Sequence, residues 1–139
     1  MRGCSSLLRR AAGVFRREPW WAEFWSALTA LAWAGFCWRG EPGGLPGLDA
    51  WPSMQVLLRL GNDRTWPLLA GGLGLLQLGF LAADRRWLRW GGAVAGCWFW
   101  AVLTVGVWAA VPWAPAVPVY GGWCGINLFS ILRLLRRHG

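Results

Sequence analysis

Residues 90–111 read WGGAVAGCWFWAVLTVGVWAAV, an apolar run without a single charged side chain. A helix needs about 20 consecutive apolar residues to cross the hydrocarbon core of a bilayer. The run meets that length, and tryptophan, which is typical of the membrane–water interface, stands near both of its ends. It therefore predicts a transmembrane helix.

Further apolar runs lie on both sides of this one, at about residues 20–38, 66–83 and 117–132. The connecting stretches contain turn chemistry, including RGEPGGLPG after the first run and three prolines before the last. A cleaved signal peptide competes for the first run. That run is longer than the apolar part of such a peptide, and no small-residue cleavage motif follows it before Arg39. We therefore expect one all-α domain, residues 1–139, built as a four-helix transmembrane bundle.

The composition agrees with this expectation. Hydrophobic residues make up 56% of the chain and charged residues 14%, against about 25% charged in an average soluble domain. A chain of 139 residues has too much surface for its volume to hide so much apolar area. The 14 tryptophans and the net charge of +8 also suggest nucleic-acid binding, but that function needs basic and aromatic residues interleaved on one face. Here they are separated, so we expect no nucleic-acid partner.

The arginines indicate which side of the membrane each connection occupies. All but three lie in the N-terminal segment, in the connection 84–89 or in the C-terminal tail. The other three are balanced by acidic residues, so the whole net charge lies on one side. Basic connections stay in the cytoplasm, and we expect both termini there, in a bacterial inner membrane. The arginines expected to fix this topology and to contact anionic lipid headgroups are Arg9, Arg10, Arg16, Arg17, Arg85, Arg86, Arg89, Arg133, Arg136 and Arg137.

Two segments are too short to span but suit the membrane surface. Residues 5–17, if helical, place apolar side chains opposite arginines, as in a basic amphipathic helix on an anionic surface. The alternative is a frayed basic tail that only sets topology. Residues 50–60 contain a short apolar stretch after Trp51 and Pro52, and we expect a helix lying at the outer interface.

Small residues recur at four-residue spacing in three of the runs. Because lipid is as apolar as leucine, membrane helices associate through close backbone approach at such positions. The candidates are Ala22, Ser26, Ala30 and Ala34 in the first run, Gly92 and Gly96 in the third, and Gly121 and Gly125 in the fourth. We favour packing within one bundle, with self-association into a larger assembly as the alternative.

Few polar side chains interrupt the apolar runs. Glu23, in the first turn of the first run, is expected to reach headgroups or to pair with Arg16, Arg17 or Arg133, in preference to relaying protons. Gln77, Thr104 and Asn127 are expected to hydrogen-bond between helices. A narrow polar path along these three residues is the alternative.

No residue pattern points to catalysis. The four cysteines include no Cys-x-x-Cys pair, and the single histidine, His138, is in the tail. The chain lacks a Ser-His-Asp set, a phosphate-binding loop and paired carboxylates. We therefore expect no enzymatic activity, no metal and no cofactor, and we interpret the cysteines as small apolar packing residues.

The stretches REPWWAEFW at 17–25 and NLFSILRLLRR at 127–137 resemble small uncharacterised four-span membrane proteins in phage and prophage gene sets of GC-rich bacteria. The use of arginine without lysine fits such genomes. The resemblance covers both ends of the chain and implies a holin-like protein that acts by assembly in the bilayer. Two alternatives remain: an accessory subunit docking on a larger membrane complex, and a small-molecule or ion conduit.

Overall fold

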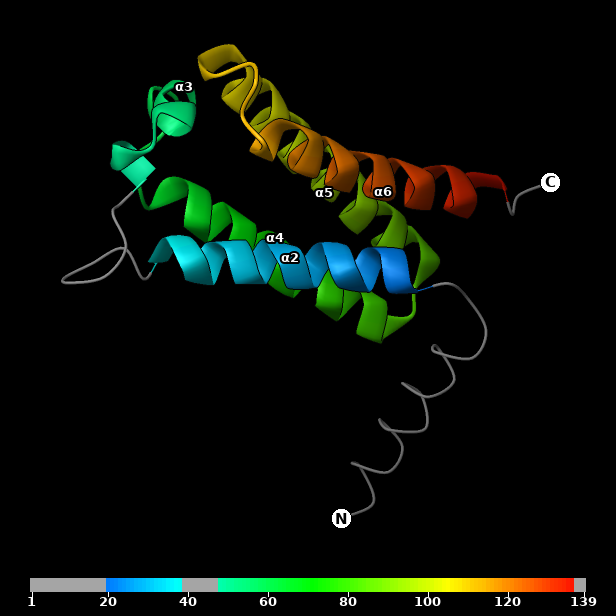
Figure 1. Ribbon diagram of the computed structural model, residues 1–139. Helices are drawn as coiled ribbons and strands as arrows, with labels where there is room; N and C mark the ends of the chain where they lie inside the picture. The colour runs from blue at the N-terminus through cyan, green and yellow to red at the C-terminus, as the bar shows by residue number, and fades with distance from the viewer. Residues whose placement is uncertain (1–19, 39–47, 137–139) are drawn as a thin grey trace.

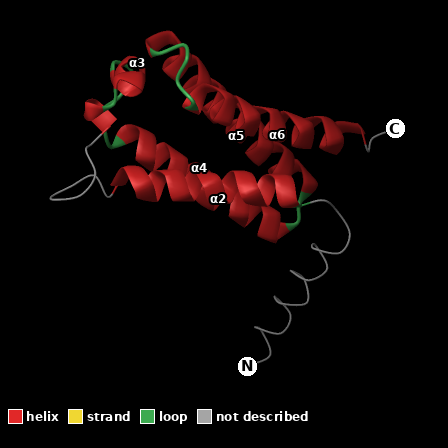
Figure 2. Cartoon of the chain, in the orientation of Figure 1, coloured by secondary structure: helices red, strands yellow, loops and turns green. Residues whose placement is uncertain are grey.

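The computed structural model describes residues 20–38 and 48–136, and all regular structure within them is helical (Figures 1 and 2). The all-α class is therefore confirmed. The long helices are α2 (Trp21–Trp38), α4 (Thr65–Ala83), α5 (Arg86–Ala110) and α6 (Ala116–Arg136). Between α2 and α4 lie two short 3₁₀ turns, η1 (Leu48–Ala50) and η2 (Pro52–Met54), and one α-turn, α3 (Gln55–Leu58). The expected helix at 5–17 and Arg9, Arg10, Arg16, Arg17 and Arg137 lie outside the described residues.

Local chemistry explains where the long helices begin and end. The side-chain oxygen of Asn62 accepts hydrogen bonds from the backbone N–H groups of Arg64 and Thr65, at 3.1 and 2.9 Å, just before α4. Pro67 and Pro118 stand in the first turns of α4 and α6, where their missing N–H groups have no intrahelical partner to lose. Asp84 ends α4 in the left-handed conformation, with φ at 50°, so α5 follows after a very short turn.

The long helices form two antiparallel pairs. Ser26, early in α2, contacts Gln77, late in α4, and Ala34 near the end of α2 faces Gly71 near the start of α4. α5 and α6 form the second pair, joined by the short connection 111–115. Within each pair, each helix therefore buries one face against the other helix, and the two pairs also contact each other.

Contacts between the two pairs fix their relative direction. Glu23 contacts Arg89, and Trp33 packs edge-on against Phe99, so α2 and α5 run in parallel. The starts of α2 and α5 and the ends of α4 and α6 consequently lie at one end of the bundle (Figure 1). We call this the basic end, because Arg85, Arg86, Arg89, Arg133 and Arg136 all lie there. The opposite end, which holds α3, is the loop end.

The outside of this fold is unusually apolar, and its interior is an apolar core with a few polar side chains. The core includes the buried side chains of Trp100, Leu103 and Val107, together with the polar side chains of Ser26, Gln77 and Asn127. Large apolar side chains also lie on the outside, among them Leu68, Leu75, Leu76, Trp98, Val105, Val119 and Phe129. Leu75 and Trp98 are each 65% exposed. Of the described helices, α4 and α5 are long and apolar enough to cross a membrane.

The expected small-residue positions divide between the inside and the outside of the bundle. Those that are buried are Ala22, Ser26, Ala30, Gly92 and Gly96. Ala34 packs beside Gly71, and Gly121 faces Thr104. Gly125 differs from the expectation for internal packing: it is exposed, with no atom of another element within 4 Å of where its side chain would begin. Gly121 therefore contacts α5, whereas Gly125, one turn further along the same side of α6, does not.

Close contacts also occur at two glycines that the four-residue pattern does not include, Gly74 and Gly106. A Cβ atom at Gly74 would lie 2.8 Å from the Ala27 carbonyl oxygen. The backbone of α2 therefore lies directly against α4 at this position. A side chain at Gly106 would lie 2.5 Å from Leu57. At both glycines, a leucine side chain or a backbone carbonyl of another helix occupies the space that a methyl group would fill.

The segment expected to form an interfacial helix at about 50–60 is helical over residues 52–58, as a 3₁₀ turn that continues into an α-turn. Pro52 starts a 3₁₀ turn, and only Gln55–Leu58 forms an α-turn. Met54 and Leu57 are buried, and the Leu57 carbonyl oxygen accepts a hydrogen bond from the Trp66 indole N–H at 3.0 Å. The segment therefore covers the end of the bundle and anchors the start of α4.

Candidate functional site

Three polar side chains from three helices meet in the interior and form a closed ring of hydrogen bonds. The Ser26 hydroxyl of α2 donates to the Gln77 side-chain oxygen of α4 at 3.3 Å. The Gln77 amide donates to the Asn127 side-chain oxygen of α6 at 3.1 Å, and the Asn127 amide donates back to the Ser26 hydroxyl at 2.8 Å. We call Ser26, Gln77 and Asn127 the polar ring. Each member is at most 3% exposed.

The two amides of the polar ring have no unused N–H donor. Gln77 also donates to the carbonyl oxygen of Gly92 in α5, at 3.0 Å, and Asn127 to that of Trp123 in its own helix, at 2.8 Å. The polar ring thus joins all four long helices. Interhelical hydrogen bonds in membranes contribute about 0.6–2 kcal/mol each, so this arrangement is suited to fixing the register of the bundle.

Glycine makes room for the polar ring. A side chain at Gly96 of α5 would overlap both Asn127 Oδ1 and Gln77 Nε2. At Gly92 it would lie 3.1 Å from the Phe80 ring. Gly92 and Gly96 therefore do more than permit close approach of two backbones, since they leave the space that two amide groups occupy.

A buried ion pair lies beside the polar ring, toward the basic end. Arg89 Nε and Nη2 donate to Glu23 Oε2 at 2.9 and 2.6 Å, and both side chains are only 4% exposed. Asp84 approaches the same guanidinium at 3.8 Å and is 60% exposed. A buried charge is tolerated when it is paired and hydrogen-bonded, and α2 and α5 supply the two halves of this pair.

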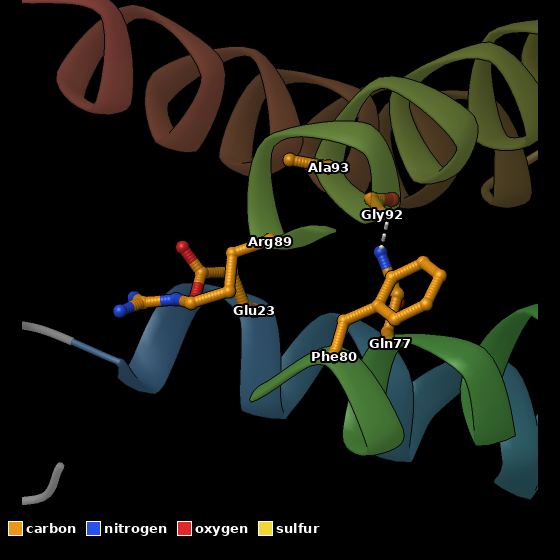
Figure 3. A pocket seen from close by; sticks show the side chains of 6 residues that line it. All are labelled: Glu23, Gln77, Phe80, Arg89, Gly92 and Ala93. Carbon is orange, nitrogen blue, oxygen red and sulfur yellow. Dashed lines mark hydrogen bonds and ion pairs between the residues drawn. The ribbon is translucent and has the colours of Figure 1, made fainter. Parts of the chain in front are cut away.

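Figure 3 shows the crevice between these two groups, which is lined by Glu23, Gln77, Phe80, Arg89, Gly92 and Ala93. It is too narrow to hold a water molecule. The ion pair closes one side, and the Gln77–Gly92 hydrogen bond closes another. The crevice is therefore filled by its own lining in this structure.

The structure unites some predicted residues and separates others. Gln77 and Asn127 meet, and Ser26, which was expected only as a small packing residue, completes their ring. Thr104 lies apart, because its hydroxyl donates to the carbonyl oxygen of Trp100 in its own helix, at 2.7 Å. That i−4 bond satisfies the hydroxyl locally.

The arginines of α5 also differ from expectation. Arg89 was expected to contact headgroups, but it points into the bundle and pairs with Glu23. Arg86 donates to the carbonyl oxygen of Leu134 near the end of α6, where carbonyl groups lack intrahelical donors. Arg85 and Arg136 are exposed, as a role at a charged surface requires.

No family model, curated protein or solved structure matches the chain. Its function must therefore be inferred from its own geometry. Within residues 20–38 and 48–136, no group of three His, Cys, Asp or Glu side chains could hold a metal ion. The arrangement can hold four helices in register and bury one ion pair.

Proposed function

We propose that this chain is a four-span protein of the bacterial inner membrane, with both termini in the cytoplasm, and that it acts without catalysis by assembling with other copies in the bilayer. The observation that carries the proposal is the apolar outer surface of the bundle: large side chains such as Leu75 and Trp98 are each 65% exposed, although the interior is already filled by an apolar core. Water disfavours so large an exposed apolar surface, whereas lipid accommodates it.

The exposed tryptophans support a membrane of ordinary thickness around the bundle. Trp90 and Trp108, 40% and 57% exposed, stand eighteen positions apart on α5. This separation is five helical turns, or about 27 Å, so both rings emerge on the same face at nearly the thickness of the hydrocarbon core, about 30 Å. Trp21 and Trp87 near the basic end and Trp38 near the loop end add to the two aromatic belts.

The less apolar composition of α2 and α6 is compatible with spanning. Their polar side chains face inward: Glu23 and Ser26 on α2, and Asn127 and Ser130 on α6, are buried. Lipid would meet the exposed residues between them, such as Leu28 and Leu132. The Trp33 indole also donates to the Tyr120 hydroxyl at 2.9 Å, which links α2 to α6.

Assembly is supported by an outer face that the bundle leaves without a partner. Gly122 and Gly125 of α6 have no neighbour within 4 Å and adjoin exposed Leu128 and Phe129. Glycine on an outer face allows the backbone of a second helix to come close. The sequence resembles phage membrane proteins, and this resemblance implies a holin-like protein. We therefore propose holin-like activity as the function of the assembly.

The two alternatives fit the geometry less well. A conduit through one bundle would pass the polar ring, whose amide donors are all occupied, and a crevice without room for water. An accessory subunit would use the same outer face for a different protein. Purification in mild detergent that recovers one stoichiometric partner would favour the accessory role over self-assembly.

We expect reporter fusions to place residue 136 in the cytoplasm and residue 55 on the opposite side. The reason is that the basic end and the loop end of the bundle face opposite directions, and the basic end holds most described arginines. Alkaline phosphatase fused at residue 55 should be active, and a fluorescent protein fused at residue 136 should fold. Residues 55 and 136 in one compartment would contradict the four-span arrangement.

We expect a cysteine at position 125 to cross-link copies of the chain in native membranes. The test uses a chain whose native cysteines are alanine, oxidised with copper phenanthroline, and compares Gly125→Cys with Gly121→Cys. Because Gly125 is on the outer face and Gly121 faces Thr104, only the first variant should give disulfide-linked dimers.

Overexpression of the native chain should also collapse the membrane potential. Two results together would contradict assembly: cross-linking that is equal in the two variants or absent from both, and a normal membrane potential during overexpression.

A further inference from the structure

Two cysteines from different helices lie against one another near the middle of the bundle. The sulfur atoms of Cys97 in α5 and Cys124 in α6 are 3.5 Å apart, and Cys124 also approaches the carbonyl oxygen of Cys97 at 3.5 Å. Both are free thiols. A disulfide needs an S–S distance of about 2.05 Å, so a relative shift of about 1.5 Å would close the bond. The sequence spacing gave no sign of this pair.

We propose that Cys97 and Cys124 form a reversible dithiol–disulfide pair that links α5 to α6 and is oxidised by a lipid-soluble, quinone-class electron acceptor. The inference rests on the membrane placement proposed above. It goes beyond that placement by assigning to the described residues a redox site and the chemical class of its reaction partner.

The position of the pair indicates the class of oxidant. Cys97 lies midway along α5 and is half-buried at the edge of the α5–α6 seam, next to Trp98, which is 65% exposed. In a four-span bundle the α5 side of this edge, where Trp98 is exposed, faces the hydrocarbon, away from both water layers. An oxidant must therefore reach the sulfur atoms through lipid, which small charged disulfides cannot enter readily.

The reaction balances with a quinone alone. Two S–H bonds break and one S–S bond forms, which releases two electrons and two protons. The quinone takes up both electrons and both protons and leaves as the quinol. Because no net charge remains on sulfur or on the acceptor, the products suit a low-dielectric environment. Reduction by a dithiol or by a quinol of lower potential reverses the step.

The experiment uses the full chain with Cys4→Ala and Cys37→Ala, reconstituted into phosphatidylglycerol vesicles, with decylubiquinone as the probe. We expect both remaining thiols to be lost to maleimide labelling, the monomer mass to fall by two hydrogens, and one quinol to form per chain. Tris(carboxyethyl)phosphine should restore both thiols. Persistence of free thiols, or loss of thiols only through linked dimers, would overturn the proposal.

A matched control moves one thiol by a single helical turn. In Cys97→Ala with Ala101→Cys, the second sulfur shifts by about 6 Å along α5, and we expect no intramolecular disulfide. Equal oxidation in this variant would overturn the proposal, as would oxidation by glutathione disulfide but not by the quinone. Sodium carbonate extraction of the same vesicles tests the membrane placement separately: a chain that stays in the pellet but keeps its thiols contradicts the dithiol proposal only.

Discussion

Replacing Arg89 with leucine should lower the free energy of unfolding by about 3–5 kcal/mol, because it leaves the buried carboxylate of Glu23 without its guanidinium partner. Glu23→Leu should have a similar effect by exposing the opposite charge to the apolar interior. The double variant removes both charges and should recover most of the loss. Thermal unfolding in detergent, followed by circular dichroism, measures all three.

A matched control separates the ion pair from the general effect of losing an arginine. Arg85 is exposed at the basic end, one turn before Arg89, and Arg85→Leu should change stability by no more than about 0.5 kcal/mol. If Arg89→Leu behaved like Arg85→Leu, the ion pair would not stabilise the bundle. A double variant whose loss equals the sum of the single losses would show that Glu23 and Arg89 are not coupled.

The second large effect is expected at Gly96, where one methyl group would occupy the space of two amides. Gly96→Ala places its Cβ against Asn127 Oδ1 and Gln77 Nε2, and overpacking of this kind costs about 1–3 kcal/mol. Displacing the polar ring would cost about 0.6 kcal/mol more for each interhelical hydrogen bond that breaks. The chain should therefore unfold at a lower denaturant concentration in mixed micelles.

The control for Gly96 is a glycine in the same helix with open space around it. Gly91 has no neighbour within 4 Å, and Gly91→Ala should raise stability by up to about 1 kcal/mol through helix propensity. Combining Gly96→Ala with Asn127→Ala should relieve part of the overlap. If Gly96→Ala stabilised the chain as Gly91→Ala does, the polar ring would not require the space at Gly96.

Some of this structure could be predicted from sequence and some could not, for identifiable reasons. Long apolar runs predict helices directly, because an apolar segment of that length must satisfy its backbone internally. Gln77 and Asn127 attract attention as polar residues within apolar runs. Their meeting with Ser26 depends on the register between three helices, and no single helix carries that information.

The misassignment of Arg89 has a different origin. Counting charges by segment assigns a side to each connection but does not show which arginine turns inward. α5 begins at Arg86, which places Arg89 within the helix. Arg89 then shares the i, i+3, i+4 stripe of Gly92, Ala93 and Gly96, all of which are buried. Extending the apolar run backward by one turn would have revealed it.

Gly74 and Gly106 escaped the four-residue pattern because their partners are large. Gly74 lies against Leu31 and the Ala27 carbonyl, and Gly106 lies against Leu57 of the short helix α3. A search for paired small residues assumes that two backbones approach each other. It does not detect a single glycine that accommodates a leucine, so such contacts depend on the three-dimensional arrangement.

The polar ring has a consequence for biosynthesis. Its members come from the first, the second and the last of the long helices, and Asn127 is the last of them to leave the ribosome. Until α6 is synthesised, Ser26 and Gln77 lack that partner. A chain cut short before residue 127 would therefore leave the Gln77 amide without one of its two hydrogen-bond acceptors, so the polar ring closes only after the last helix has been made.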